Sequence, residues 1–163
     1  MKLEIARMGA RGDGEADTPG GVVHVPFTLP GEAANVAVDG HKGSVMSLLV
    51  PSPDRIVPAC RHFESCGGCS LQHWHREPML EWKRQLVIDA LAKRGIDAAV
   101  QPTIGSGPGG RRRVTLSGRR EHGSGRTGFN AAHSHDIVEI SECPVASQIL
   151  VSAFPVIREL ARL

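Results

Sequence analysis

The chain has 163 residues, of which 40% are hydrophobic and 22% are charged, a composition that supports a packed core and excludes wholesale disorder. Its net charge of +2 is too small to indicate a nucleic-acid partner by itself. The sequence contains neither an apolar run long enough to span a bilayer nor the apolar segment of a secretory leader, so we expect a cytoplasmic chain that does not bind membranes.

The first 50 residues predict several short strands. The β-prone runs are 2–7, 21–25, 35–38 and 43–50, with turn residues such as Asp39-Gly40 between them. The chain also contains 19 Gly and 11 Pro, which favours frequent turns over a helical bundle. This spacing is typical of a small barrel or curled sheet, and we place a first domain at residues 1–52.

A proline-containing linker at 51–59 leads into a cysteine-rich loop and then a helix. The helix is predicted over 78–94, because apolar residues recur at three- and four-residue intervals between Pro78 and the helix-ending Gly95. The loop and the helix together define a second region, residues 53–95.

The remaining residues, 96–163, predict a partial mixed-sheet domain that ends in a helix. Strands are expected at 98–101, 112–117, 127–130 and 136–140. A helical pattern over 144–163 contains Pro155, which is expected to kink or divide it. The fold class is therefore α+β. The last helix ends at Leu163 with apolar residues in phase and no capping residue, so we expect a chain shorter than its full-length protein.

Four cysteines form the most informative motif of the chain. Three fall within ten residues with C-x5-C-x2-C spacing, and the fourth is distant and followed by Pro144. The candidate metal ligands are Cys60, Cys66, Cys69 and Cys143. Such a set can hold a cubane iron–sulfur cluster, and Gly67 and Gly68 would let the backbone pass close to it and present N–H groups.

Other chemistry for these cysteines has weaker support. Structural zinc sites usually show two C-x2-C pairs, whereas this chain has one, so zinc stays open as an alternative. A thioredoxin-like pair at Cys66 and Cys69 would need a βαβ context that the flanking sequence does not show. Disulfides are disfavoured in a reducing compartment. We also expected His73 to pack against the cysteine region.

Clustered arginines indicate a local basic face. The RNA-contact candidates are Arg111, Arg112, Arg113 and Arg126. Arginine binds phosphate through paired hydrogen bonds and stacks on bases. The alternative is a solvated edge strand whose charges prevent aggregation.

The segment Cys60-x5-Cys66-Gly-Gly-Cys69-Ser-Leu-Gln-His73, followed by Leu80-Glu-Trp-Lys83, resembles the iron–sulfur segment of the S-adenosylmethionine-dependent RNA uracil-5-methyltransferases, in particular the branch that acts on 23S ribosomal RNA. Gly12-Asp-Gly14 and Leu29-Pro-Gly-Glu32 are similar to the TRAM domain of that family, an OB-like β-barrel that binds RNA. Arg111-Arg-Arg-Val114 and Glu142-Cys-Pro144 resemble its central domain.

The resemblance implies that the four cysteines hold a [4Fe–4S] cluster and that the partner is ribosomal RNA. In this family, S-adenosylmethionine, the nucleophilic cysteine and a catalytic glutamate belong to a C-terminal Rossmann-like domain. This chain offers no residues for those roles, so we assign no catalytic residues and expect no methyl transfer from the chain alone. The alternative hypothesis is a free-standing RNA-binding module with four cysteines on iron–sulfur or zinc, or a small electron carrier.

Overall fold

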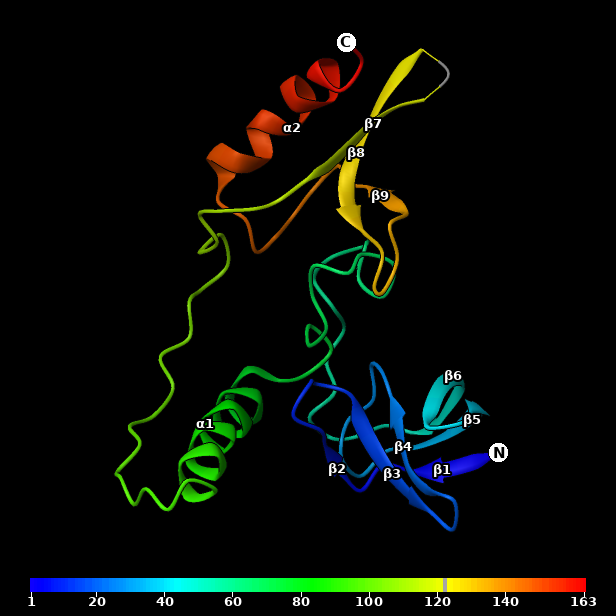
Figure 1. The fold of residues 1–163 in the computed structure, drawn as a ribbon, viewed down its shortest axis with the longest axis vertical. Coiled ribbons are helices and arrows are strands. Elements are labelled where there is room, and N and C mark those ends of the chain that lie inside the picture. The colour runs from blue at the N-terminus through cyan, green and yellow to red at the C-terminus, as the bar shows by residue number, and fades with distance from the viewer. Residues whose placement is uncertain (122) are drawn as a thin grey trace. The chain divides into compact units, whose positions relative to one another are not determined.

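The computed structural model describes residues 1–121 and 123–163, which divide into two compact units. The first unit comprises Met1–Val57 and Ser70–Ile104, and the second comprises Pro58–Cys69 and Gly105–Leu163. The predicted α+β class is confirmed, since two sheets and two helices form the described part of the chain (Figure 1). No helix in these residues is long and apolar enough to cross a membrane.

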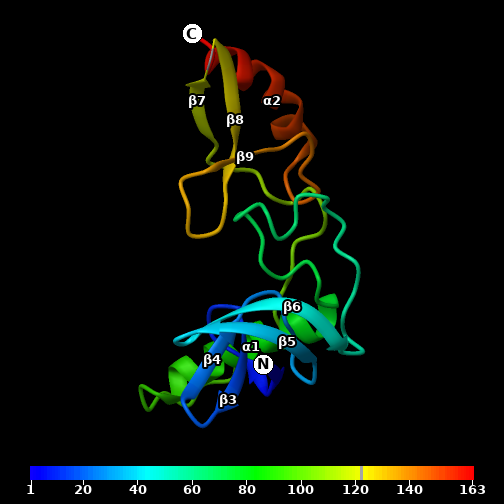
Figure 2. The same cartoon turned by 90° about the vertical axis from the view of Figure 1, so that its right-hand side faces the viewer.

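The first unit is built on a six-stranded mixed sheet, seen in blue to cyan in Figures 1 and 2. Its strands are β1 Lys2–Glu4, β2 Arg7–Met8, β3 Gly14–Thr18, β4 Gly21–Val25, β5 Ala33–Asp39 and β6 Lys42–Val50. They lie in the order β1-β5-β6-β4-β3-β2, and only the β4–β6 pair is parallel. The two end strands, β1 and β2, do not pair with each other among the described residues, so the sheet does not close into a barrel.

Alternating aliphatic side chains form the core of this sheet. The buried residues are Leu3, Ile5, Ala16, Val23, Val25, Ala34 and Val36. Gly43 leaves room for this core, because a Cβ at that position would clash with Val36 and Val25.

The strand at 21–25 is confirmed to the residue, and those predicted at 35–38 and 43–50 are extended by a few residues. The run at 2–7 is divided into β1 and β2. Strand β3 was not predicted, because Ala16 is its only apolar residue and its period-two signal is therefore weak.

The first unit also contains helix α1, Arg76–Ala92, which begins and ends two residues before its predicted bounds. None of its residues is fully buried. It contacts the rest of the unit through Trp82, whose ring centroid lies 5.6 Å from that of Trp74, and through Arg84, whose Nε donates to the Val100 carbonyl at 3.0 Å. The strand predicted at 98–101 is wrong, since this segment pairs with no strand among the described residues.

The second unit packs one helix on a three-stranded antiparallel sheet. The strands are β7 Ser117–Glu121, β8 Ser124–Asn130 and β9 Ile137–Glu139, in the order β7-β8-β9. Helix α2, Gln148–Leu160, lies along β8, and Phe129, Ile140 and Phe154 form the buried core between them (Figure 2).

Of the two outcomes expected at Pro155, a division of the helix is wrong, because α2 runs through it as one helix. Pro155 itself is exposed, so its ring displaces no core side chain. The strand predicted at 112–117 is largely wrong, because β7 begins only at Ser117. The strands predicted at 127–130 and 136–140 overlap β8 and β9 well.

Candidate four-cysteine site

The fold places all four cysteines in the second unit. Cys60, Cys66 and Cys69 lie in the segment Pro58–Cys69, and Cys143 lies between β9 and α2. Each is partly buried and none forms a disulfide. Cys66 and Cys143 pack against the same aromatic core, so the packing of this unit joins the distant cysteine to the clustered ones.

Contacts within the protein hold the two cysteine-bearing segments. The Gly67 N–H donates to the Asn130 carbonyl at 2.9 Å, and a Cβ at Gly67 would lie 2.8 Å from that oxygen. Arg61 donates to Glu142 Oε2 at 3.0 Å, joining the residues that adjoin Cys60 and Cys143. Gly67 is therefore required for close backbone packing, and its N–H is already engaged instead of being available for a cluster sulfide.

Arg111, which is expected to contact RNA, lies beside this site. Both of its terminal nitrogens are 3.4 Å from the Gly68 carbonyl, between two of the cysteines. Its backbone N–H donates to Val145 and its carbonyl accepts from Ser147, each at 2.9 Å. Arg111 thus bridges the Cys66–Cys69 loop and the segment that follows Cys143.

The surroundings of Cys66 favour its neutral thiol over the thiolate. Burial raises the pKa of the Cys66 thiol, and the neighbouring Cys69, Cys60 and Cys143 raise this pKa further. A hydrogen bond from the Gly68 N–H, 3.4 Å from Cys66 Sγ, opposes this shift only in part. Cys66 is therefore a neutral thiol at physiological pH, and a metal ion or cluster bound here would have to displace its proton.

Among the described residues, no set of three or more His, Cys, Asp or Glu side chains is arranged to hold a single metal ion. The donor set itself consists of four sulfurs, which suits soft metals and iron–sulfur clusters.

The other arginine candidates lie on or beside the small sheet. Arg112 and Arg113 are exposed, just before β7. Arg126, on β8, is 43% exposed, and its NH1 lies 3.4 Å from a Glu121 carboxylate oxygen. Arg119 belongs to the clustered arginines of the sequence but is not among the predicted RNA contacts, and it lies directly opposite Arg126 on β7. This pairing depends on the strand register, which the sequence alone does not give.

The first unit contains a buried ion pair that the sequence did not predict. Glu32 is fully buried, and its carboxylate accepts from Arg55 and from the backbone N–H groups of Leu29 and Ser52. Burial alone would raise the pKa of Glu32, but these hydrogen bonds outweigh it, so the pKa is lowered. The pair ties the chain after β6 to the loop before β5.

His73 packs in this same unit, where its ring meets the Phe27 ring at a centroid distance of 6.3 Å. Burial, followed by the charge of Arg55, lowers the pKa of His73 to about 4, so the imidazole is neutral at physiological pH. The expected role beside the cysteines is replaced by one in the core of the first unit.

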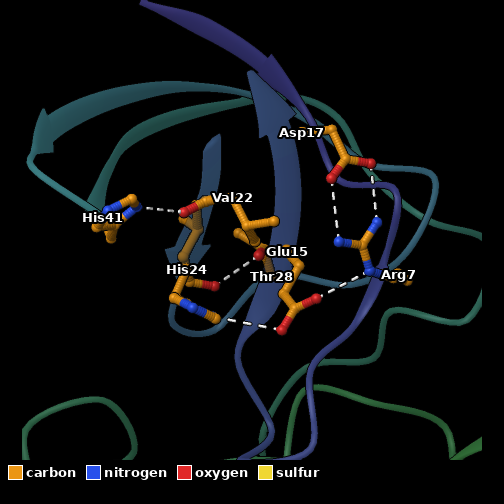
Figure 3. A network of polar contacts seen from close by, with 8 residues as sticks. Arg7, Glu15, Asp17, Val22, His24, Thr28 and His41 are labelled. Atoms are coloured by element: carbon orange, nitrogen blue, oxygen red, sulfur yellow. Dashed lines mark hydrogen bonds and ion pairs between the residues drawn. The ribbon is translucent and has the colours of Figure 1, made fainter. Parts of the chain in front are cut away.

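The outer face of β2, β3 and β4 carries a second charge network (Figure 3). Arg7 makes two hydrogen bonds to Asp17, at 2.8 and 3.0 Å, and one to Glu15 at 2.9 Å. The other Glu15 oxygen lies 3.4 Å from His24 Nδ1. The acidic residues near the N-terminus are thus matched within their own sheet.

The chain is similar to proteins named as RNA methyltransferases, although no protein-family model matches it. It is 47% identical over 162 residues to a Brucella suis protein named "uncharacterized RNA methyltransferase", and 45% identical to a Caulobacter vibrioides protein of the same name. These alignments cover 99% and 98% of the chain and 39% of each relative. The relatives are thus RNA methyltransferases by name, and the chain spans about two fifths of their length.

A more specific relative is the 23S rRNA (uracil(1939)-C(5))-methyltransferase RlmD of Halomonas elongata, with 35% identity over 169 residues. That alignment covers 97% of the chain and 35% of the relative. The predicted resemblance to the RNA uracil-5-methyltransferases is thereby confirmed.

Proposed function

We propose that the chain is the RNA-binding, [4Fe–4S]-carrying portion of an RNA uracil-5-methyltransferase that modifies 23S ribosomal RNA. The observation that carries this proposal is the grouping of all four cysteines in one unit, in a chain whose relatives are named as RNA methyltransferases.

The four cysteines fit such a cluster by their chemistry. Around zinc, Zn–S bonds of about 2.3 Å in a tetrahedron bring the sulfurs to roughly 3.8 Å from one another. A cubane binds each thiolate to a different iron and so spaces the sulfurs more widely. What supports the cubane here is the donor set itself, four cysteine sulfurs within one unit.

The cluster, when bound, supplies a rigid cross-link of four metal–thiolate bonds. Three of its ligands, Cys60, Cys66 and Cys69, would come from the segment Pro58–Cys69. The fourth, Cys143, would come from the segment between β9 and α2. Methylation at C5 of uracil requires no net electron transfer, so the function we assign to these cysteines is to shape the second unit for RNA.

The RNA would contact both units. The curled sheet of the first unit would serve as a TRAM-like RNA-binding domain, and the arginines of the second unit would bind phosphates. The chain provides no candidate for the methyl-donor site or the catalytic cysteine, because its four cysteines are all assigned to the cluster. Methyl transfer would therefore depend on a further domain, as the greater length of the relatives suggests.

Anaerobic purification, with visible absorbance and assays for iron, sulfide and zinc, tests the cluster. We expect a brown protein with about four irons and four sulfides per chain. Replacing any one of the four cysteines by serine should abolish most of the iron, whereas Ser70→Ala, an exposed neighbour of Cys69, should retain it. A colourless protein with one zinc per chain would refute the cluster and favour the zinc alternative.

Binding to fragments of 23S rRNA tests the second half of the proposal. We expect an affinity that falls steeply as salt increases. A reversible redox couple in a protein without RNA affinity would favour the electron carrier instead.

A further inference from the structure

The small sheet of the second unit has one face covered by α2. Gly118 and Thr127 are cross-strand partners on this face, and a Cβ at Gly118 would lie 3.3 Å from the Ala161 side chain. Gly125, on the same face, lies against the Arg158 backbone. Because neighbouring residues of a strand point to opposite faces, the residues between these positions face away from α2.

Two arginines lie directly opposite each other on the uncovered face. The register of β7 and β8 pairs Arg119 with Arg126, which brings their Cβ atoms to about 5 Å. Two like charges in this position destabilise a sheet unless an anion neutralises them.

The protein itself neutralises this pair incompletely. The Arg119 side chain is exposed and has neither a hydrogen bond nor an ion pair within residues 1–121 and 123–163. Arg126 has one long contact, 3.4 Å from Glu121, and its Nε is buried without an acceptor in the same residues. Both partners of the Glu121–Arg126 contact are more than 40% exposed, so the contact is weak and a stronger anion can displace it.

Arg113 extends the basic surface along the chain. Val114 and Leu116 pack against the core beneath α2, whereas Arg113, which precedes them, is exposed. Arg119 lies six positions after Arg113, a reach of up to about 20 Å. A single small anion cannot span that distance, whereas a nucleic-acid backbone can.

We infer that Arg113, Arg119 and Arg126, here called the arginine face, bind successive phosphates of an RNA strand. This inference rests on the proposed function and assigns the phosphate contacts to one face of the small sheet. Guanidinium groups bind phosphate through paired hydrogen bonds, so these contacts position RNA without reading its sequence. Arg111 is excluded from the arginine face because it is engaged with the cysteine loop.

The experiment measures binding of the cluster-loaded chain to a 23S rRNA fragment at several salt concentrations. Loss of one phosphate contact should reduce the slope of log K against log[salt] by about 0.7 to 1. We expect this reduction for Arg119→Ala, Arg126→Ala and Arg113→Ala. The matched control is Arg158→Ala, an exposed arginine of α2, which should leave the slope unchanged.

Two further variants give effects that a loss of structure would not produce. Arg119→Lys keeps the charge and should retain the wild-type slope. Glu121→Gln removes the competing carboxylate and should strengthen RNA binding by a few fold. Equal iron content in every variant shows that the second unit is intact.

The outcomes separate the two claims. A wild-type chain that does not bind RNA overturns the proposed function. A wild-type chain that binds RNA, with Arg119→Ala and Arg126→Ala indistinguishable from Arg158→Ala, overturns the arginine face alone. An unchanged or weaker affinity for Glu121→Gln would also contradict it.

Discussion

The two units of this protein differ in how their charged groups are partnered. In the first unit, Arg7 is bonded to two carboxylates and Arg55 to the buried Glu32. In the second, Arg113 and Arg119 have no polar partner within the described residues. Arg7 and Arg55 are thus held by carboxylates of their own unit, whereas the side chains of Arg113 and Arg119 are available to an external ligand.

The hydrophobic cores of the two units also differ in size. Seven buried aliphatic residues fill the first sheet. The core cluster of the second unit contains three buried residues, and two cysteines, Cys66 and Cys143, pack against it. Small units with limited cores commonly depend on metal sites for stability, so we expect the second unit to depend on its cluster and the first to fold without it.

Removal of the cluster should cause the largest loss of stability, and this loss should be confined to the second unit. Tight binding of a group to the folded state adds about 4 kcal/mol or more, which corresponds to at least about 10 °C in the unfolding temperature of a small unit. We expect calorimetry to show this loss after the iron is removed with a chelator. Tryptophan fluorescence should change little, since Trp74 and Trp82 both belong to the first unit. Equal effects on both signals would contradict independent units.

Glu32→Gln should have the next largest effect, now on the first unit. The substitution leaves Arg55, whose side chain is 22% exposed, without its carboxylate, at a cost of about 2–4 kcal/mol. Urea unfolding followed by tryptophan fluorescence measures this loss. Glu4→Gln, an exposed carboxylate on β1, is the control and should change the free energy of unfolding little.

The pH dependence provides a second check on Glu32. Its pKa is lowered in the folded state, so its contribution is present above its ordinary pKa and is lost as the pH falls through the lowered value. The stability of the first unit should therefore decline in acid below about pH 4.5, its ordinary pKa, and less so in Glu32→Gln. The same acid dependence in the variant would refute this role.

Arg111→Ala should have a smaller effect, confined to the cysteine site. A long hydrogen bond to the Gly68 carbonyl contributes about 1 kcal/mol or less, so a chelator should remove iron up to about fivefold more readily. Arg112→Ala, an exposed neighbour without a polar partner in the described residues, should keep wild-type iron retention. If Arg111→Ala instead changes only the salt dependence of RNA binding, Arg111 is an RNA contact.

Arg7→Ala should cause the smallest loss of stability, again in the first unit. Its hydrogen bonds lower the pKa of Asp17, but both side chains are largely exposed, so water and salt weaken the network. We expect a urea midpoint only slightly below that of the wild type, and much less reduced than that of Glu32→Gln. In about 1 M salt, where screening acts within about 3 Å, the difference should vanish.

The sequence alone determined the features that depend on local pattern. Local sequence patterns sufficed for the strand at 21–25 and, within two residues at each end, for the helix that contains Pro78, and the cysteine spacing around Gly67-Gly68 is itself such a pattern. The family resemblance also depends on linear motifs, and it was confirmed. The domain bounds at 52 and 95 and the metal itself stay predictions.

Only the tertiary structure decided which distant residues meet. The register of β7 and β8 places Arg119 opposite Arg126, and a shift of one residue would have directed them to different faces. Packing in the second unit places Cys143 against the core that Cys66 also contacts, and burial of Glu32 makes it the partner of Arg55. These pairings depend on long-range packing and desolvation, which have no signature in a local stretch of sequence.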